Sequence, residues 1–119
     1  MKRIAVIPNN SKDIGLVNTK RLVEFLNGKA EIYIDEAYSV LGLNVNYVAE
    51  NEILDNAEYL IVLGGDGTIL QRAAECAKRK IPVLGINLGK IGFMTEIEID
   101  DMEDAISKFL QDDFTVEKE

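Results

Sequence analysis

Histidine is absent from this chain of 119 residues, and cysteine occurs once, as Cys76. The lack of histidine excludes catalytic triads and metal centres that depend on an imidazole. A lone cysteine excludes an intramolecular disulfide framework and a thiolate-rich zinc site. This cysteine usage suits a reducing compartment, and we expect a cytoplasmic protein. Cys76 falls close to the apolar face of an expected helix, so we predict a buried, unreactive thiol.

Long apolar segments are also lacking. At the amino terminus, Lys2 and Arg3 precede an apolar run that covers only residues 4–7 before Pro8 interrupts it. A secretory signal needs an apolar stretch of about 7–15 residues, and a membrane-spanning helix needs about 20. We therefore expect no signal peptide, no membrane span and no membrane partner.

Positive charge is scarce as well. The chain carries 13 Lys and Arg against 21 Asp and Glu, a net charge of −8 with a pI near 4.6. Proteins that grip a nucleic-acid backbone are expected to be basic. Nucleic-acid binding as the main function is therefore disfavoured. A small anion held by backbone amides needs no net positive charge, so this kind of ligand stays open.

The residues that are present fit one soluble globular domain. Apolar residues make up 47% and charged residues 29% of the chain, and its length suits a single compact unit. Continuous apolar runs at residues 4–7, 60–63 and 82–86 are typical of buried strands in a parallel sheet. Residues 31–34 alternate polar and apolar side chains, which predicts a weaker strand near an edge.

Helical spacing of apolar residues appears between and after these runs. It predicts a helix over residues 19–26, with Gly28 as its stop, and another over residues 68–80. A third helix is expected behind Asp100, which would cap it. Residues 38–56 indicate only a short helix and a loop. The strand–helix alternation predicts a three-layer α/β domain of βαβ type with a mostly parallel sheet.

The sharpest local signal is the segment Gly64-Gly65-Asp66-Gly67-Thr68, which lies between a predicted strand and a predicted helix. Glycines let the backbone take positive φ and let a ligand approach without a Cβ in the way. The N-terminus of the following helix presents unpaired N–H groups and a partial positive charge, which favour phosphate. A carboxylate there repels phosphate, so we predict that Asp66 accepts a proton from a hydroxyl, orients that hydroxyl or holds Mg²⁺.

A plainer interpretation of this loop stays open. Asp66 or Thr68 would then be an ordinary N-cap, and the glycines would only make a tight turn. The spacing matches neither the G-x-G-x-x-G pattern of dinucleotide-binding folds nor the G-x-x-x-x-G-K-[ST] pattern of P-loops. Both of those assignments are therefore excluded.

A second group of residues follows the next predicted strand, beginning at Asn87. If the two strands are neighbours, both segments leave one edge of the sheet and could face each other across a cleft. Gly89 and Gly92 would let the backbone run close to a ligand. Lys90 could meet a phosphate, and Phe93 could lie against a flat ring. In the alternative, Phe93 fills the core and Lys90 is solvated.

The two motifs together closely resemble the NAD kinases, which make NADP from NAD and ATP. They are the Gly-Gly-Asp-Gly-Thr loop and, about twenty residues later, Asn87-x-Gly89-x-x-Gly92-Phe93-x-Thr95-Glu96. The glycine loop by itself is shared with lipid kinases and, more loosely, with phosphofructokinases, whereas the pair is highly specific. The resemblance covers nearly the whole chain. It implies the amino-terminal α/β domain of the family at residues 1–111, with residues 112–119 beginning a linker to a missing, β-rich carboxy-terminal domain.

The resemblance also implies roles for individual residues. Asp66 matches the family's proton acceptor on the 2′-hydroxyl of the adenosine ribose, and Gly67 and Leu70 would lie against NAD beside it. Phe93 matches an aromatic residue near the adenine end. The residues implied to shape the loops around the phosphates of ATP are Gly64, Gly65, Thr68, Asn87, Gly89, Lys90 and Gly92.

One position departs from the family pattern. Many members carry a basic residue where this chain has Gln71, and Arg72 follows one position later. Successive residues of a helix point about 100° apart, so we do not transfer that contact to Arg72.

The implied reaction is phosphoryl transfer from ATP to NAD, with Mg²⁺ or another divalent cation neutralising the triphosphate. We expect no metal site made by the protein, because the acidic residues Glu96, Glu98, Asp100 and Asp101 read as a solvated face. NAD and ATP are the expected partners, and a homo-oligomer is compatible with the family. Half of the positioning groups would come from the carboxy-terminal domain, so we expect these 119 residues alone to make little or no NADP.

Two other functions stay open. The first is a non-catalytic nucleotide-binding module made of this domain alone. The second is a lipid kinase domain of the diacylglycerol type. Lipid kinases usually follow the glycine loop with Asn-Glu, whereas Leu70-Gln71 stands here.

Overall fold

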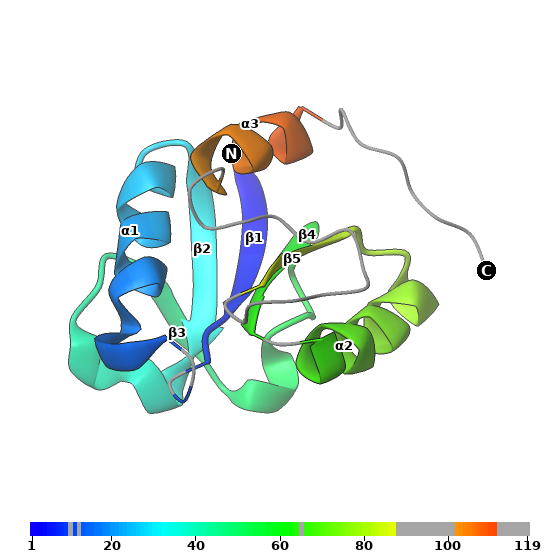
Figure 1. Ribbon diagram of the computed structural model, residues 1–119, viewed down its shortest axis with the longest axis horizontal. Helices are drawn as coiled ribbons and strands as arrows, with labels where there is room; N and C mark the ends of the chain where they lie inside the picture. Colours follow the sequence, from blue (N-terminus) through cyan, green and yellow to red (C-terminus); the bar gives the residue numbers. More distant parts are fainter. Residues whose placement is uncertain (10, 12, 65, 88–101, 112–119) are drawn as a thin grey trace.

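The computed structural model describes residues 1–9, 11, 13–64, 66–87 and 102–111, with the backbone alone at 66–70, 72, 73, 87, 102 and 105. Five strands form one sheet in the order β3-β2-β1-β4-β5, and every neighbouring pair is parallel (Figure 1). The strands are β1 (Lys2–Ile7), β2 (Ala30–Asp35), β3 (Asn46–Val48), β4 (Tyr59–Gly64) and β5 (Val83–Asn87).

The strands predicted at residues 4–7, 60–63 and 82–86 are confirmed as β1, β4 and β5. The weaker strand predicted at 31–34 is β2, and it lies second from the edge. The edge itself is β3, a strand of three residues in a segment where only a short helix and a loop were expected. That expectation was incomplete, because β3 is too short to carry an alternating pattern of its own.

In the described part of the chain, three α-helices cover the two faces of the sheet, which gives the predicted three layers (Figure 1). They are α1 (Val17–Leu26), α2 (Asp66–Arg79) and α3 (Met102–Leu110). Shorter 3₁₀ segments are η1 (Ile14–Leu16), η2 (Glu36–Leu41) and η3 (Glu50–Glu52). In the described part of the chain, no helix is long and apolar enough to cross a bilayer.

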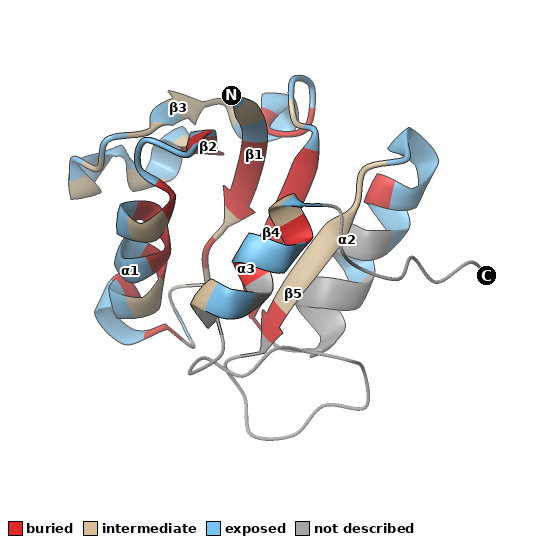
Figure 2. Cartoon of the chain, turned by 90° about the horizontal axis from the view of Figure 1, so that it is seen from above, coloured by how far each residue is buried: buried red, intermediate tan, exposed pale blue. Residues whose placement is uncertain are grey.

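The core consists of two clusters, because side chains alternate between the two faces of a strand. The cluster against α1 and α3 includes Ile4, Val6, Ile61, Leu22 and Ile106. The cluster against α2 includes Ala5, Leu60, Val62 and Cys76. Figure 2 shows the buried residues gathered on β1, β4 and the sides of the helices that face them. The prediction that Cys76 is buried is confirmed, since none of its surface is exposed.

The helix ends follow the sequence signals. Asn27 is the C-cap of α1, and Gly28 beyond it has a φ of 84°, which confirms the predicted stop. Lys78 and Arg79 lie in the last turn of α2, where positive charge complements the helix dipole. The helix expected behind Asp100 is α3, and Asp100 itself lies outside the described residues.

Candidate functional site

The carboxyl ends of β4 and β5 define one edge of the sheet. The two strands pair in parallel, and their last residues, Gly64 and Asn87, stand opposite each other in register. The expectation that these strands are neighbours is therefore confirmed. The two strands therefore end side by side at the same edge of the sheet. Ligands of open α/β sheets bind outside this edge.

The helix that follows β4 begins almost at once. Gly64 is buried as the last residue of β4, and α2 begins at Asp66. The first turn of α2 therefore points its unpaired N–H groups toward the carboxyl edge, where a phosphate would be stabilised. Asp66, Gly67 and Thr68 lie in that turn, and Leu70 lies in the next. The described backbone thus places the N-terminus of α2 at the carboxyl edge of the sheet.

The remaining predicted site residues lie outside the described part of the chain. They are Gly65, Gly89, Lys90, Gly92 and Phe93. The acidic residues Glu96, Glu98, Asp100 and Asp101 also lie there. Among the described residues, no group of three or more Asp, Glu, Cys or His side chains could hold a metal ion.

β1 brings a third segment to the same edge. β1 pairs with β4, with Ile7 opposite Val62, so the end of β1 lies next to the end of β4. The strand order reverses its direction here, since the chain passes from β1 outward to β2 and β3 and then returns to β4 on the other side of β1. Such a switch point is the preferred binding position of an open α/β sheet.

The loop from β1 to α1 is organised by Asp13, which is 1% exposed. One carboxylate oxygen, Oδ1, accepts hydrogen bonds from the backbone N and the side-chain Nδ2 of Asn18, both at 3.0 Å. The other, Oδ2, accepts from the backbone N and Oγ1 of Thr19, both at 2.9 Å. Asp13 thus caps α1 from a position three residues before the N-cap residue, Leu16.

This cap requires an unusual backbone turn. Gly15 has a φ of 68° and Leu16 a φ of 55°, so two successive residues are left-handed. A left-handed non-glycine residue costs about 1–2 kcal/mol. Sequence rules missed the cap, because they place the capping side chain directly before the helix. The available signal was a short polar residue, Asp13, a few positions before an apolar helical pattern.

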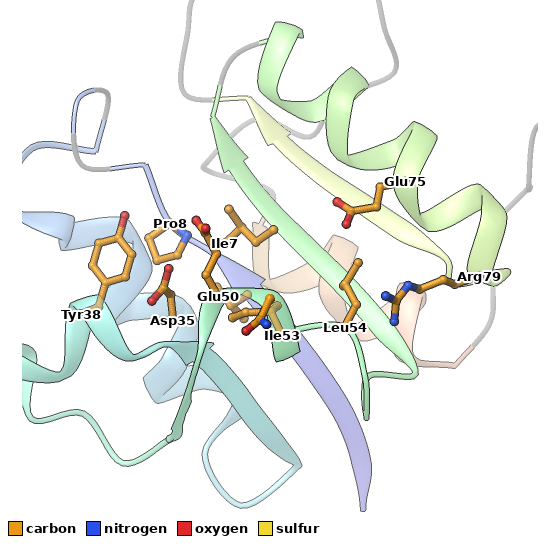
Figure 3. Close-up of a pocket in the computed structure, with 11 residues that line it drawn as sticks. Ile7, Pro8, Asp35, Tyr38, Glu50, Ile53, Leu54, Glu75 and Arg79 are labelled. Carbon is orange, nitrogen blue, oxygen red and sulfur yellow. The ribbon is translucent and has the colours of Figure 1, made fainter.

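A pocket of about 240 Å³ lies on the α2 side of the sheet, beside the end of β1 (Figure 3). Its apolar lining comes from Val6, Ile7, Pro8, Ile53 and Leu54. Its polar lining comes from Asp35, Tyr38, Glu50, Asn51, Glu75 and Arg79. The three carboxylates outnumber the single guanidinium, and Arg79 is also paired with Asp55 at 3.2 Å. The negative lining disfavours phosphate in this pocket, so the pocket and the glycine loop differ in chemistry.

Tyr38 shows the electrostatic character of the pocket. Burial raises the pKa of the Tyr38 phenol above its ordinary value of 10.0, and the charge of Asp35 raises the pKa further. The phenol therefore stays protonated through the physiological range and can donate a hydrogen bond. No sequence pattern indicated this pocket, because its residues come from four separate segments of the chain.

Comparison with known proteins agrees with the sequence motifs. The family model described as the ATP-NAD kinase N-terminal domain matches residues 4–114. A protein named NAD kinase from Lachnoclostridium phytofermentans is 41% identical over 119 residues, which cover 98% of this chain and 40% of that protein. Another NAD kinase, from Acetivibrio thermocellus, is 36% identical over 99% of this chain and 42% of its own length. The chain therefore spans about two fifths of these relatives.

A solved structure shares the fold. The crystal structure of yeast NADH kinase complexed with NADH superposes with a TM-score of 0.78 and 14% sequence identity. The match covers 95% of this chain and 39% of that one. At this identity, the likeness shows a shared fold alone.

Proposed function

Since this chain belongs to the NAD kinase family, we propose that it forms the α/β part of an enzyme that phosphorylates NAD. The terminal phosphate of ATP would pass to the 2′-hydroxyl of the adenosine ribose and give NADP. The observation that carries the proposal is the pairing of Gly64 with Asn87 at the carboxyl edge. This pairing brings the starting points of both family motifs together, beside the N-terminus of α2.

In this reaction, Asp66 would accept the proton that leaves the 2′-hydroxyl as the new O–P bond forms. Gly67, Leu70 and Phe93 would contact NAD around that hydroxyl. The remaining motif residues would line the phosphates with backbone N–H groups and the Lys90 ammonium; they are Gly64, Gly65, Thr68, Asn87, Gly89, Lys90 and Gly92. Positioning and electrostatic stabilisation would provide most of the catalysis, as in other phosphoryl transfers.

A divalent cation such as Mg²⁺ would neutralise the triphosphate of ATP. Mg²⁺ in such sites is held largely by phosphate oxygens and water, with one or two carboxylates from the protein. The lack of a three-carboxylate cluster among the described residues is compatible with that mode of binding. A cytoplasmic location, where ATP and NAD are available, would suit this reaction.

We also propose that the catalytic site is shared with a further domain. Residues 1–111 would form the nucleotide-binding domain, and residues 112–119 would lead toward the remainder of the protein. The share of about two fifths that the chain covers in its relatives supports this division. The isolated chain would then bind its substrates weakly and turn them over slowly, because positioning groups would be missing. Association into a homo-oligomer would be compatible with this arrangement.

The experiment is a graft in which residues 1–119 replace the matched part of the Lachnoclostridium phytofermentans relative. Purified graft, the unaltered relative and the isolated chain are incubated with NAD, ATP and Mg²⁺, and NADP is measured. We expect NADP from the graft and little or none from the isolated chain. A folded graft that binds NAD without making NADP would favour a non-catalytic nucleotide-binding module. A graft that phosphorylates diacylglycerol instead would identify a lipid kinase.

A further inference from the structure

Two helix N-termini face the carboxyl edge of the sheet. Helix α1 follows β1 and helix α2 follows β4, and these two strands are parallel neighbours. A helix N-terminus attracts an anion, because its first N–H groups lack partners within the helix and carry partial positive charge. The edge therefore offers two positions where a phosphate could be stabilised, one on each face of the sheet.

At α1, a side chain of the protein already holds this position. The carboxylate of Asp13 accepts hydrogen bonds from the backbone N–H groups of Asn18 and Thr19, the second and third residues of the helix. Two further bonds come from the side chains of the same residues. Asp13 is the one charged side chain among the buried residues that the structure describes. Among the residues that the structure describes, no lysine or arginine forms an ion pair with Asp13. The partners of its carboxylate are therefore the donors of Asn18 and Thr19 in the first turn of α1.

We propose that Asp13 is the resident anion of α1, which closes this helix N-terminus to phosphate and leaves α2 to bind the phosphates of the nucleotide. Asp13 is thus a positioning residue: it touches no substrate and acts through the loop that it holds. This role rests on the proposed kinase function. Occupation of the anion position at the N-terminus of α1 by the Asp13 carboxylate can be tested on the 119-residue chain alone.

The loop around Asp13 is shaped for this purpose. The backbone N of Asp13 donates to the carbonyl of Asn9 at 2.8 Å, and the backbone N of Leu16 donates to the carbonyl of Asp13 at 2.8 Å. The two left-handed residues, Gly15 and Leu16, turn the chain so that the Asp13 side chain reaches over the first turn of α1. The same turn leaves Ile14 and Val17 with 76% and 64% of their surface exposed.

Chemical rescue tests the resident anion directly. Asp13→Gly removes a group with the shape of acetate from a position where Asp13 has φ −98° and ψ 81°, a conformation that glycine adopts freely. The ¹⁵N–¹H spectrum of the 119-residue chain is recorded during titration with formate, acetate or inorganic phosphate, with chloride at matched ionic strength as the reference. Asp13→Ser provides a second variant, since serine keeps a short capping group and perturbs the loop less.

In the unaltered chain, we expect the amide signals of Asn18 and Thr19 to ignore all these anions. In Asp13→Gly, the same two signals should shift saturably with formate and acetate, because the N-terminus of α1 then lacks its resident anion. The matched control is Asp35→Gly, which removes the carboxylate that accepts from the Ala37 backbone N in η2. It should leave Asn18 and Thr19 unresponsive. The proposal is overturned if the unaltered chain responds at these amides, or if neither folded Asp13 variant does.

A kinetic arm connects the resident anion to the reaction. In the graft described above, Asp13→Gly should raise the KM for ATP several-fold while kcat changes by less than about twofold, and formate should lower the KM again. Unchanged KM with a positive rescue in the spectrum would refute the positioning role. A graft that is inactive before any substitution would contradict the kinase function, and the spectra of the isolated chain would still decide the anion position.

Discussion

Helix α3 docks on the sheet through the buried side chains of Ile106 and Phe109, and removal of the Phe109 ring should release the helix. Phe109 is 3% exposed and meets the ring of Tyr59 edge to face, with centroids 5.3 Å apart and planes at 71°. The Lys2 ammonium lies 4.9 Å from the centre of the same Tyr59 ring and also donates to the carbonyl of Leu110. These contacts join the end of α3 to β1 and β4.

The magnitude follows from the size of the cavity and the length of the helix. Replacing a buried phenylalanine by alanine costs about 3–5 kcal/mol, of which the edge-to-face contact provides about 0.5–1.5 kcal/mol. The nine residues of α3 are too few to form a stable helix alone, so α3 depends on its docking. The cost of Phe109→Ala is also limited by the free energy of docking, because the chain can release α3 rather than keep the cavity.

We therefore expect Phe109→Ala to lower the free energy of unfolding by about 3 kcal/mol or more. Amide hydrogen exchange of α3 should become fast, while β1 and β4 keep their protection. Urea unfolding and exchange measured by NMR give both quantities. The control is Lys108→Ala on the same helix, which breaks an exposed ion pair with Asp104 at 3.4 Å and should cost about 0.2–0.5 kcal/mol. A loss below about 1 kcal/mol with α3 still protected would refute this account of docking.

Three further outcomes can be checked on the same chain. Tyr38 should titrate above pH 10.0. Because the folded chain keeps this proton to higher pH than the unfolded chain, the free energy of unfolding should fall as the pH rises above 10.0. An absorbance titration of the chain and of Tyr38→Phe isolates the signal of this phenol, and ionisation at or below pH 10.0 would contradict its burial. Cys76 should react slowly with a thiol reagent in the native chain and rapidly in urea, since it has no exposed surface; equal rates would show that the α2 face is open. Ile61→Ala in the interior strand β4 should cost about 2–5 kcal/mol, because Ile61 is fully buried. Val40→Ala, at a position 90% exposed, should stay within about 0.5 kcal/mol. Similar losses for both variants would contradict the burial pattern.

Much of this fold could be predicted, because the apolar residues of the sequence pattern are the residues that are buried in the structure. The runs that became β1, β4 and β5 are apolar on both faces of the strand, as a sheet covered on both sides requires. Gly28 marked the end of α1 because only a residue that accepts positive φ suits that position. The two motifs can meet only if β4 and β5 are neighbours, and the sequence pattern does not decide which strands are neighbours. The register of Gly64 with Asn87 shows that β4 and β5 are.

The features that sequence reasoning missed depend on contacts between distant or unusually placed residues. β3 exists through its pairing with β2, where Tyr33 stands opposite Asn46, and three residues carry too little pattern to show it. The cap by Asp13 depends on the left-handed Leu16, a conformation that no local rule assigns to leucine. The pocket around Tyr38 joins β1, the segments after β2 and β3, and α2, so only the folded chain brings its residues together.

Turnover of the graft with Asp66→Asn tests whether the glycine loop is the catalytic centre. Asparagine keeps the size of the side chain and removes its capacity to accept the proton of the ribose hydroxyl. A positioned general base contributes about 10²–10⁴ in rate, so kcat should fall by that factor while the affinity for NAD changes little. The control is Asp104→Asn on the exposed side of α3, which should leave kcat unchanged. Near-normal turnover by Asp66→Asn would contradict the assignment of the glycine loop as the catalytic centre.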